Sequence, residues 1–68
     1  MKNMSEKLGR NLKRIRTDKN MSQGDIARAL GVDHGYMSNI ENGKRNPTLA
    51  TITKLAEALK VSVGELLK

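Results

Sequence analysis

A short stretch of the chain, from His34 to Arg45, concentrates side chains that can recognise a partner without covalent chemistry. Amides and hydroxyls can match the donors and acceptors of a partner, and the two cations can bind an anion. His34 is the only histidine, and the sequence offers it neither a nucleophile nor a second ligand, so it suits neither catalysis nor metal binding. The recognising side chains are Ser38, Asn39, Asn42, Lys44 and Arg45.

The charge balance points to an anionic partner. Thirteen Lys and Arg face seven Asp and Glu, which gives a formal net charge of +6. Basic residues are frequent between Lys7 and Lys19 and recur at Lys44 and Arg45. Such an excess favours a polyanion, although charge alone leaves a merely soluble basic protein as the alternative.

Length and composition narrow the class further. The 68 residues predict one domain over 1–68, and the absence of cysteine excludes a disulfide framework and a cysteine-based zinc site. No apolar run reaches the length of a signal peptide or a membrane span, so we expect a cytoplasmic protein without a membrane partner. No cofactor, metal or small-molecule ligand is predicted.

The elements that must position these side chains are helices. Leu8, Leu12 and Ile15 follow a helical period and predict a first amphipathic helix. Its cap is either Asn3 or Ser5, and it ends near residues 18–20.

Two short helices follow, each with a start signal and a stop signal. Ser22 and Asp25 form a capping box for a helix that ends at Gly31. Asp33 caps the next helix, and Gly43 stops it.

Two further helices complete the chain. Pro47 and Thr48 open one of them, and Ser62 with Glu65 forms a capping box for the last. No stretch alternates with period two, so the predicted fold class is all-α. The residues of the fourth helix expected to face inward are Leu49, Ile52, Leu55, Ala56 and Leu59.

The link between the second and third helices is too short for anything but a sharp turn. Only Gly31 and Val32 separate Leu30 from the cap Asp33, and glycine can adopt the left-handed conformation that such a turn needs. This spacing, over about residues 22–43, is that of a helix-turn-helix.

The chain resembles the XRE family, which includes the lambda-type phage repressors and Cro proteins. The resemblance covers about Leu8 to Leu67 and implies a compact five-helix, lambda-repressor-like DNA-binding domain. Met37 replaces the more usual isoleucine or valine. The matching marks are Gln23, Ala27 and Gly31, then Ile40-Glu41-Asn42-Gly43, then Asn46-Pro47-Thr48-Leu49.

The resemblance implies that the third helix lies in the major groove of DNA. On a helical wheel, Met37 and Ile40 face the core, while small or hydrogen-bonding residues face outward and suit base edges. An ordinary polar surface is the alternative reading of this face. The residues expected to read bases are His34, Gly35, Ser38 and Asn39, with Asn39 suited to adenine.

A second set is expected to contact phosphates or to brace the reading side chains. Two roles are open for Tyr36. Its hydroxyl could bind a phosphate, or its ring could cover the edge of the core. In the phage repressors that the chain resembles, an arginine and a glutamate matching Arg16 and Glu41 form a pair, which we interpret as scaffold. The full phosphate or bracing set is Ser22, Gln23, Tyr36, Asn42, Lys44 and Arg45.

The last helix, about residues 61–68, is the expected dimer interface. Val63 and Leu67 lie four apart on one face and have no obvious partner within the chain, so a second copy could cover them. The alternative is that this helix simply caps the core.

The sequence therefore predicts a transcription regulator that binds double-stranded DNA sequence-specifically. It is expected to bind a palindromic operator as a homodimer, with repression as the expected role. An antitoxin or other protein-interaction module on the same fold is the alternative. An enzyme is not predicted, and a membrane-surface helix is disfavoured because the first helix needs its apolar face for the core. Segment "YMSNIENG" is somewhat similar to restriction–modification controller proteins.

Overall fold

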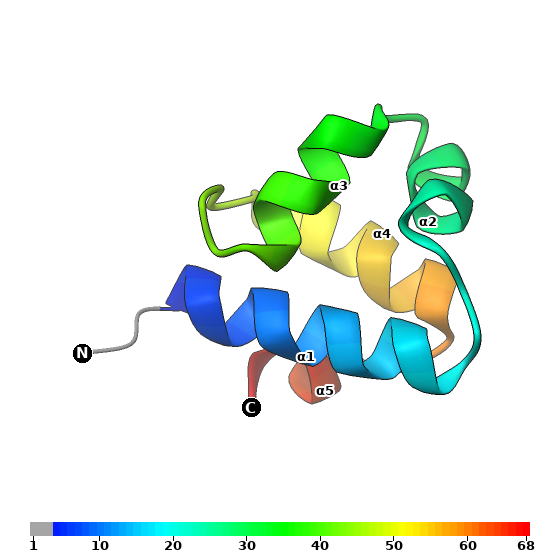
Figure 1. The fold of residues 1–68 in the computed structure, drawn as a ribbon. Helices are drawn as coiled ribbons and strands as arrows, with labels where there is room; N and C mark the ends of the chain where they lie inside the picture. Colours follow the sequence, from blue (N-terminus) through cyan, green and yellow to red (C-terminus); the bar gives the residue numbers. More distant parts are fainter. Residues whose placement is uncertain (1–3) are drawn as a thin grey trace.

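Five helices form the part of the chain that the structure describes. The computed structural model describes residues 4–68, and no strand occurs within them. The predicted all-α class with five helices is therefore confirmed, and Figure 1 shows their arrangement. No helix in residues 4–68 has the length and apolar character needed to cross a membrane. The helices are α1 (Met4–Asp18), α2 (Gln23–Leu30), α3 (His34–Glu41), α4 (Leu49–Leu59) and α5 (Val63–Leu67).

The helix starts follow the capping signals of the sequence. Ser22 Oγ accepts from the Asp25 N–H at 3.0 Å, and Asp25 Oδ2 accepts from the Ser22 N–H at 2.8 Å, so the predicted capping box is present. The side chains of Asp33, Thr48 and Ser62 each accept a backbone N–H three residues on. Such bonds satisfy N–H groups that have no partner within the helix. The Glu65 side chain accepts no bond from the Ser62 N–H, so the capping box expected for α5 is only half formed.

The start of α1 differs from one of the two expectations. The helix already includes Met4, so Ser5 lies inside it and cannot be its cap. Asn3, the other expected cap, lies outside the described residues.

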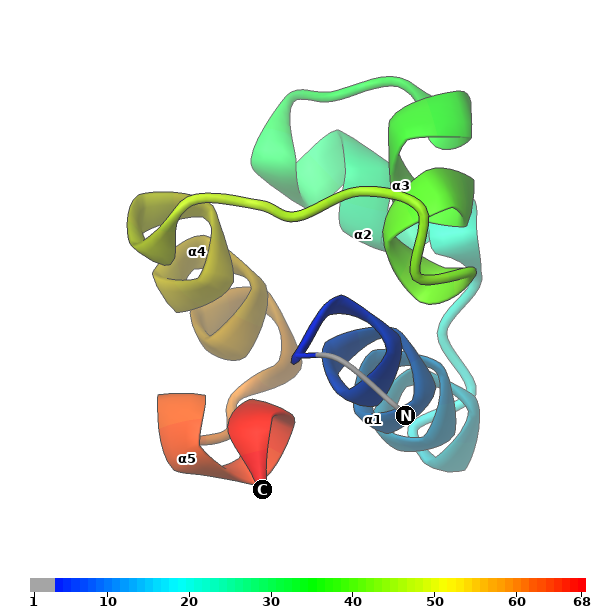
Figure 2. The ribbon, with the colours of Figure 1, turned by 90° about the vertical axis from the view of Figure 1, so that its left-hand side faces the viewer.

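The core lies between α1 and the other four helices. Figure 2 looks along α1 and shows α3 on one side of it and α5 on the other. Leucine and isoleucine dominate the buried set, as the helical periods predicted. Its members are Leu8, Leu12, Ile15, Ile26, Ala27, Met37, Ile40, Ile52, Leu55, Ala56, Leu59 and Leu66.

One predicted core residue is on the surface. Leu49 is 68% exposed, so the expectation that it faces inward is wrong. It is the first residue of α4, directly after the cap Thr48, and this first turn extends past the core. The preceding Pro47 is buried instead.

Helix α3 approaches α1 closely at Gly9. A Cβ at Gly9 would lie 2.5 Å from the carbonyl oxygens of both Ile40 and Glu41. Any side chain there would push α3 away from α1. Gly9 therefore sets how closely the third helix is held.

The short helix α5 packs on the core more fully than expected. Leu66 is completely buried, and Asn11 Nδ2 of α1 donates to its carbonyl oxygen at 2.8 Å. Val63 and Leu67 are partly buried and pack against the core, so the expectation that they lack a partner within the chain is wrong. A helix of five residues depends on such packing, because it is too short to be stable alone.

Candidate nucleic-acid interface

Helix α3 presents one buried face and one open face. Met37, Ile40 and Glu41 are buried against the rest of the molecule. Among the residues expected to read bases, His34, Gly35 and Asn39 are exposed, and Ser38 is half-buried. Gly35, Ser38 and Asn39 therefore lie on the open side of α3, as the helical wheel predicted, and His34 is exposed at the first position of the helix.

The turn before α3 fixes the angle at which the helix leaves α2. Gly31 has φ 73°, in the left-handed region, and the Val32 N–H donates to the Ala27 carbonyl at 3.0 Å. Asp33 Oδ1 then accepts from the Tyr36 N–H at 2.7 Å and starts α3. The glycine is required because other residues rarely adopt this conformation without strain.

A buried carboxylate ties α3 to two other helices. Glu41 Oε2 accepts from Arg16 Nε at 2.6 Å, and Glu41 Oε1 accepts from Arg16 Nη2 at 3.1 Å. The same Oε1 accepts from Gln23 Nε2 at 2.9 Å. Arg16 Nη1 also donates to the Met21 carbonyl at 2.7 Å, so the network reaches the loop before α2.

This network is largely removed from water. The Arg16 and Glu41 side chains are 13% and 2% exposed. The hydrogen bond from Arg16 to Glu41 raises the pKa of the guanidinium above its usual value, so Arg16 stays charged. The network holds the C-terminal end of α3 against α1 and the start of α2.

The residues expected to contact phosphates or to brace the reading side chains differ in their surroundings in the structure. The Gln23 amide donates to Glu41, which is a bracing contact. Ser22 is exposed, but its hydroxyl caps α2. Asn42 is exposed at the end of α3, and its Nδ2 lies 3.4 Å from Ser38 Oγ.

Both cations after α3 are exposed, and one is held by an aromatic ring. Arg45 Cζ lies 4.5 Å from the centre of the Tyr36 ring, a cation–π contact. Tyr36 is partly buried against the core, as one of its two readings predicted. The Lys44 N–H donates to the Asn39 carbonyl at 2.9 Å, which folds the loop back beside α3.

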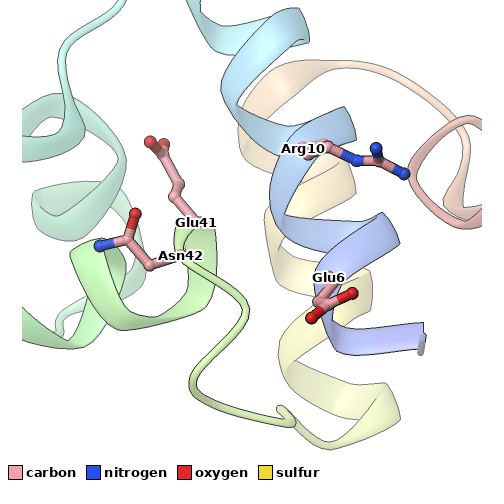
Figure 3. Close-up of a pocket in the computed structure, with 4 residues that line it drawn as sticks. All are labelled: Glu6, Arg10, Glu41 and Asn42. Atoms are coloured by element: carbon pink, nitrogen blue, oxygen red, sulfur yellow. The ribbon is translucent and has the colours of Figure 1, made fainter. Parts of the chain in front are cut away.

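A small hollow lies between α1 and the end of α3. Its volume is about 280 Å³, and it is lined by Glu6, Arg10, Glu41 and Asn42 (Figure 3). Figure 3 shows the Arg10 side chain pointing away from α3. Within residues 4–68, no group of three or more His, Cys, Asp or Glu residues could hold a metal ion.

Two residues that position the site were not predicted. Gly9 gives α3 its close seat on α1, and Asn11 holds α5. Both lie beside the apolar stripe of the first helix, and this position could have indicated that they contact another helix. A glycine inside a helix is unfavourable by about 1 kcal/mol, which could have indicated a close contact.

Comparison with known proteins agrees with this architecture. The family model described as HTH_3, helix-turn-helix, matches residues 12–66. The uncharacterized HTH-type transcriptional regulator y4dJ of Sinorhizobium fredii is 40% identical over 63 residues, which cover 93% of this chain and 82% of the relative.

Two solved structures share the fold. The restriction–modification controller protein C.AhdI of Aeromonas hydrophila has a TM-score of 0.86 and 40% identity, covering 91% of this chain and 94% of that one. The restriction–modification controller protein C.Esp1396I, solved as a tetramer in complex with its natural 35 base-pair operator, has a TM-score of 0.81 and 30% identity, with both chains covered completely.

Proposed function

This chain belongs to the HTH_3 helix-turn-helix family, and we propose that it is a transcription regulator that binds a double-stranded DNA operator through the open face of α3. The observation that carries the proposal is the rigid presentation of that face. Three buried residues and the Glu41 network fix the inner side of α3, while hydrogen-bonding side chains occupy the outer side.

The dimensions of α3 suit the major groove. An α-helix with its side chains is about 10–12 Å across, and the major groove is about 12 Å wide. Asn39 is exposed on the middle of the open face, where an amide can bond bidentately to adenine. His34 and Ser38 would bond neighbouring base edges, and Gly35 would allow the backbone to approach closely.

Phosphate contacts would come from the two ends of the helix-turn-helix. Lys44 and Arg45 are exposed after α3, and Ser22 is exposed before α2. The Tyr36 ring would orient the Arg45 guanidinium before DNA arrives, which reduces the entropy lost on binding. Gln23 acts as a brace in this proposal, through Glu41.

The working unit in this proposal is a homodimer on a palindromic operator. One recognition helix covers few base pairs, and two-fold symmetry doubles the contact. The exposed parts of Val63 and Leu67 would form the interface, while their other parts pack on the core. The tetramer on operator DNA formed by C.Esp1396I supports assembly beyond the monomer.

The regulatory role completes the proposal. A compact domain that occupies an operator blocks access to it, so repression is the expected effect. The protein acts in the cytoplasm and catalyses no reaction in this proposal.

Selection of binding sites from random duplex DNA tests the reading face. The parent should yield a symmetric consensus, and Asn39→Ala should lose preference at one position of each half-site, by about 1–3 kcal/mol. Alanine favours helices, so α3 should persist. Identical consensus sequences for the parent and Asn39→Ala would contradict the assignment of Asn39.

A matched pair of lysine variants tests the phosphate contacts. Lys44→Ala should weaken all duplexes alike and reduce the salt slope of log K by about one, whereas Lys54→Ala on α4 should leave it unchanged. A duplex affinity that does not depend on salt would refute the DNA-binding proposal.

A matched pair of leucine variants tests the dimer. Leu67→Glu should give a monomeric mass in solution, while Leu49→Glu, at the exposed start of α4, should leave the mass of the parent. Circular dichroism should show that both variants remain helical. A monomeric parent at high concentration, binding single half-sites as tightly as palindromes, would exclude the dimer.

A further inference from the structure

The excess positive charge of the chain lies outside the helix-turn-helix. Residues 22–48 contain three basic and three acidic side chains, so their formal charges cancel. Residues 4–19 contain six basic and two acidic side chains, which leaves a formal charge of +4. Four of these cations are exposed on α1 and define the α1 basic surface, namely Lys7, Arg10, Lys13 and Arg14.

The contacts of α1 show which way the α1 basic surface faces. Gly9 and Arg16 face α3, and Asn11 faces α5. Because successive helical residues are about 100° apart, three of the four cations lie about 110–170° around the axis from the α3 side, and Lys13 lies about 50° from it. DNA in contact with the open face of α3 would leave most of this surface free.

Within residues 4–68, the positive charge of the α1 basic surface is only partly offset by neighbouring carboxylates. None of its four cations forms an ion pair with another residue in the described range 4–68, whereas Arg16 is paired with Glu41. The acidic residues of α1, Glu6 and Asp18, lie one turn from Arg10 and Arg14 on the same side of the helix, so four cations there face two carboxylates. A hollow of about 360 Å³ is lined by Arg10, Lys13, Arg14, Thr17 and Asp18.

We propose that the α1 basic surface binds the phosphates of a second DNA duplex while α3 occupies the operator. The inference rests on the proposed function, because it assumes that α3 holds the first duplex. Each protomer would then contact two duplex segments on different sides, and an operator-bound protein would bridge or fold the DNA around it.

The chemistry of the surface favours DNA over a membrane or an acidic protein. A helix that binds a membrane inserts its apolar face, but the apolar face of α1 is buried in the core. Protein interfaces depend on aromatic or other large anchors, and the exposed face of α1 carries only charged and small polar residues between Lys7 and Thr17. Phosphate binding requires cations alone, and these recur along about 10 Å of helix.

A capture experiment separates the two DNA surfaces. A duplex recovered by the binding-site selection is fixed to a bead and saturated with protein, and a fluorescent 24-base-pair duplex of random sequence is then added. The test variant is Arg10→Gln/Arg14→Gln, and the matched control is Lys54→Gln/Lys60→Gln, which removes the same charge from α4 and its C-cap. Operator affinity is measured separately for each protein.

The parent and the control should capture the fluorescent duplex, and capture should weaken with salt. The test variant should lose most of the capture, and its salt slope should fall by about two, while its operator affinity changes less than about twofold. If the parent holds the operator but captures no second duplex, or if the test variant captures as well as the parent, this inference is wrong. If poly-glutamate competes as well as DNA of equal charge, an acidic protein is the partner and the DNA assignment is overturned. If the protein fails to hold the selected duplex at all, the proposed function fails first.

Discussion

Removal of the Glu41 carboxylate should strongly destabilise the fold. In Glu41→Ala, the Arg16 guanidinium keeps its bond to the Met21 carbonyl but loses both carboxylate oxygens, at 2.6 and 3.1 Å. Gln23 loses its acceptor as well. The variant therefore leaves a charge in a site where the arginine side chain is only 13% exposed.

The expected loss follows from this burial. Breaking a buried ion pair by removing one partner costs about 3–5 kcal/mol. The remaining exposure of Arg16 and its bond to Met21 place the expected loss near the lower end, about 3 kcal/mol. For a domain of this size each kcal/mol shifts Tm by about 4–8 °C, so the melting temperature should fall by about 12–24 °C.

Urea unfolding at several protein concentrations measures the effect and separates it from dimerisation. Arg28→Ala is the matched control, because it breaks a pair with Asp25 of similar length whose side chains are 75% and 41% exposed. That pair should contribute much less to stability, because solvent screens the attraction between exposed charges.

A double variant isolates the cause of the loss. Arg16→Met/Glu41→Leu removes both charges and leaves no buried ion, so it should be far more stable than Glu41→Ala. A loss below about 1 kcal/mol in Glu41→Ala, or a double variant as unstable as the single one, would refute the reasoning that an uncompensated arginine is responsible.

Three further changes test the fold. Gly9→Ala should destabilise by about 1–3 kcal/mol in urea unfolding, because the new Cβ would lie 2.5 Å from two backbone carbonyls of α3. Lys60→Gly should stabilise by about 0.5–1 kcal/mol, since Lys60 has φ 59° and glycine removes the left-handed strain at some cost in chain entropy. Backbone and hydroxyl hydrogen bonds from Ser22 lower the pKa of Asp25, so its stabilisation is present above about pH 4 and is lost as the pH falls through the lowered value. The stability difference between the parent and Asp25→Asn, measured by urea unfolding at pH 7 and pH 3, should shrink at the lower pH.

The helices could be predicted because their boundaries are set by local bonds. The caps Ser22, Asp33 and Thr48 each bond within three residues along the chain, so their partners can be read from the sequence. Leu49 was mispredicted because periodicity shows the direction of a side chain but not where the core ends. The turn at one end of an apolar stripe can extend beyond the part of the molecule that buries the rest of the stripe.

The site was predictable where it depends on a single helix. The open face of α3 follows from the period of Met37 and Ile40, so its residues could be placed from the sequence. The contact between Tyr36 and Arg45 could not, because it depends on how the loop folds back. The charge of α1 could be counted, but the side on which its cations lie depends on which flank packs against α3.

Helix α1 connects the two surfaces that a dimeric regulator would need. Arg16 joins it to the end of α3, and Asn11 joins it to the carbonyl of Leu66 in α5. Two polar contacts on opposite flanks of one helix therefore help the apolar core to fix the position of the recognition helix relative to α5. In a dimer formed through α5, the separation of the two recognition helices would be set by this frame, and half-sites lie about 34–36 Å apart in such complexes. Arg16 and Asn11 would thus influence operator spacing without contacting DNA. The distance between half-sites depends on how α5 and α3 are held by the same helix.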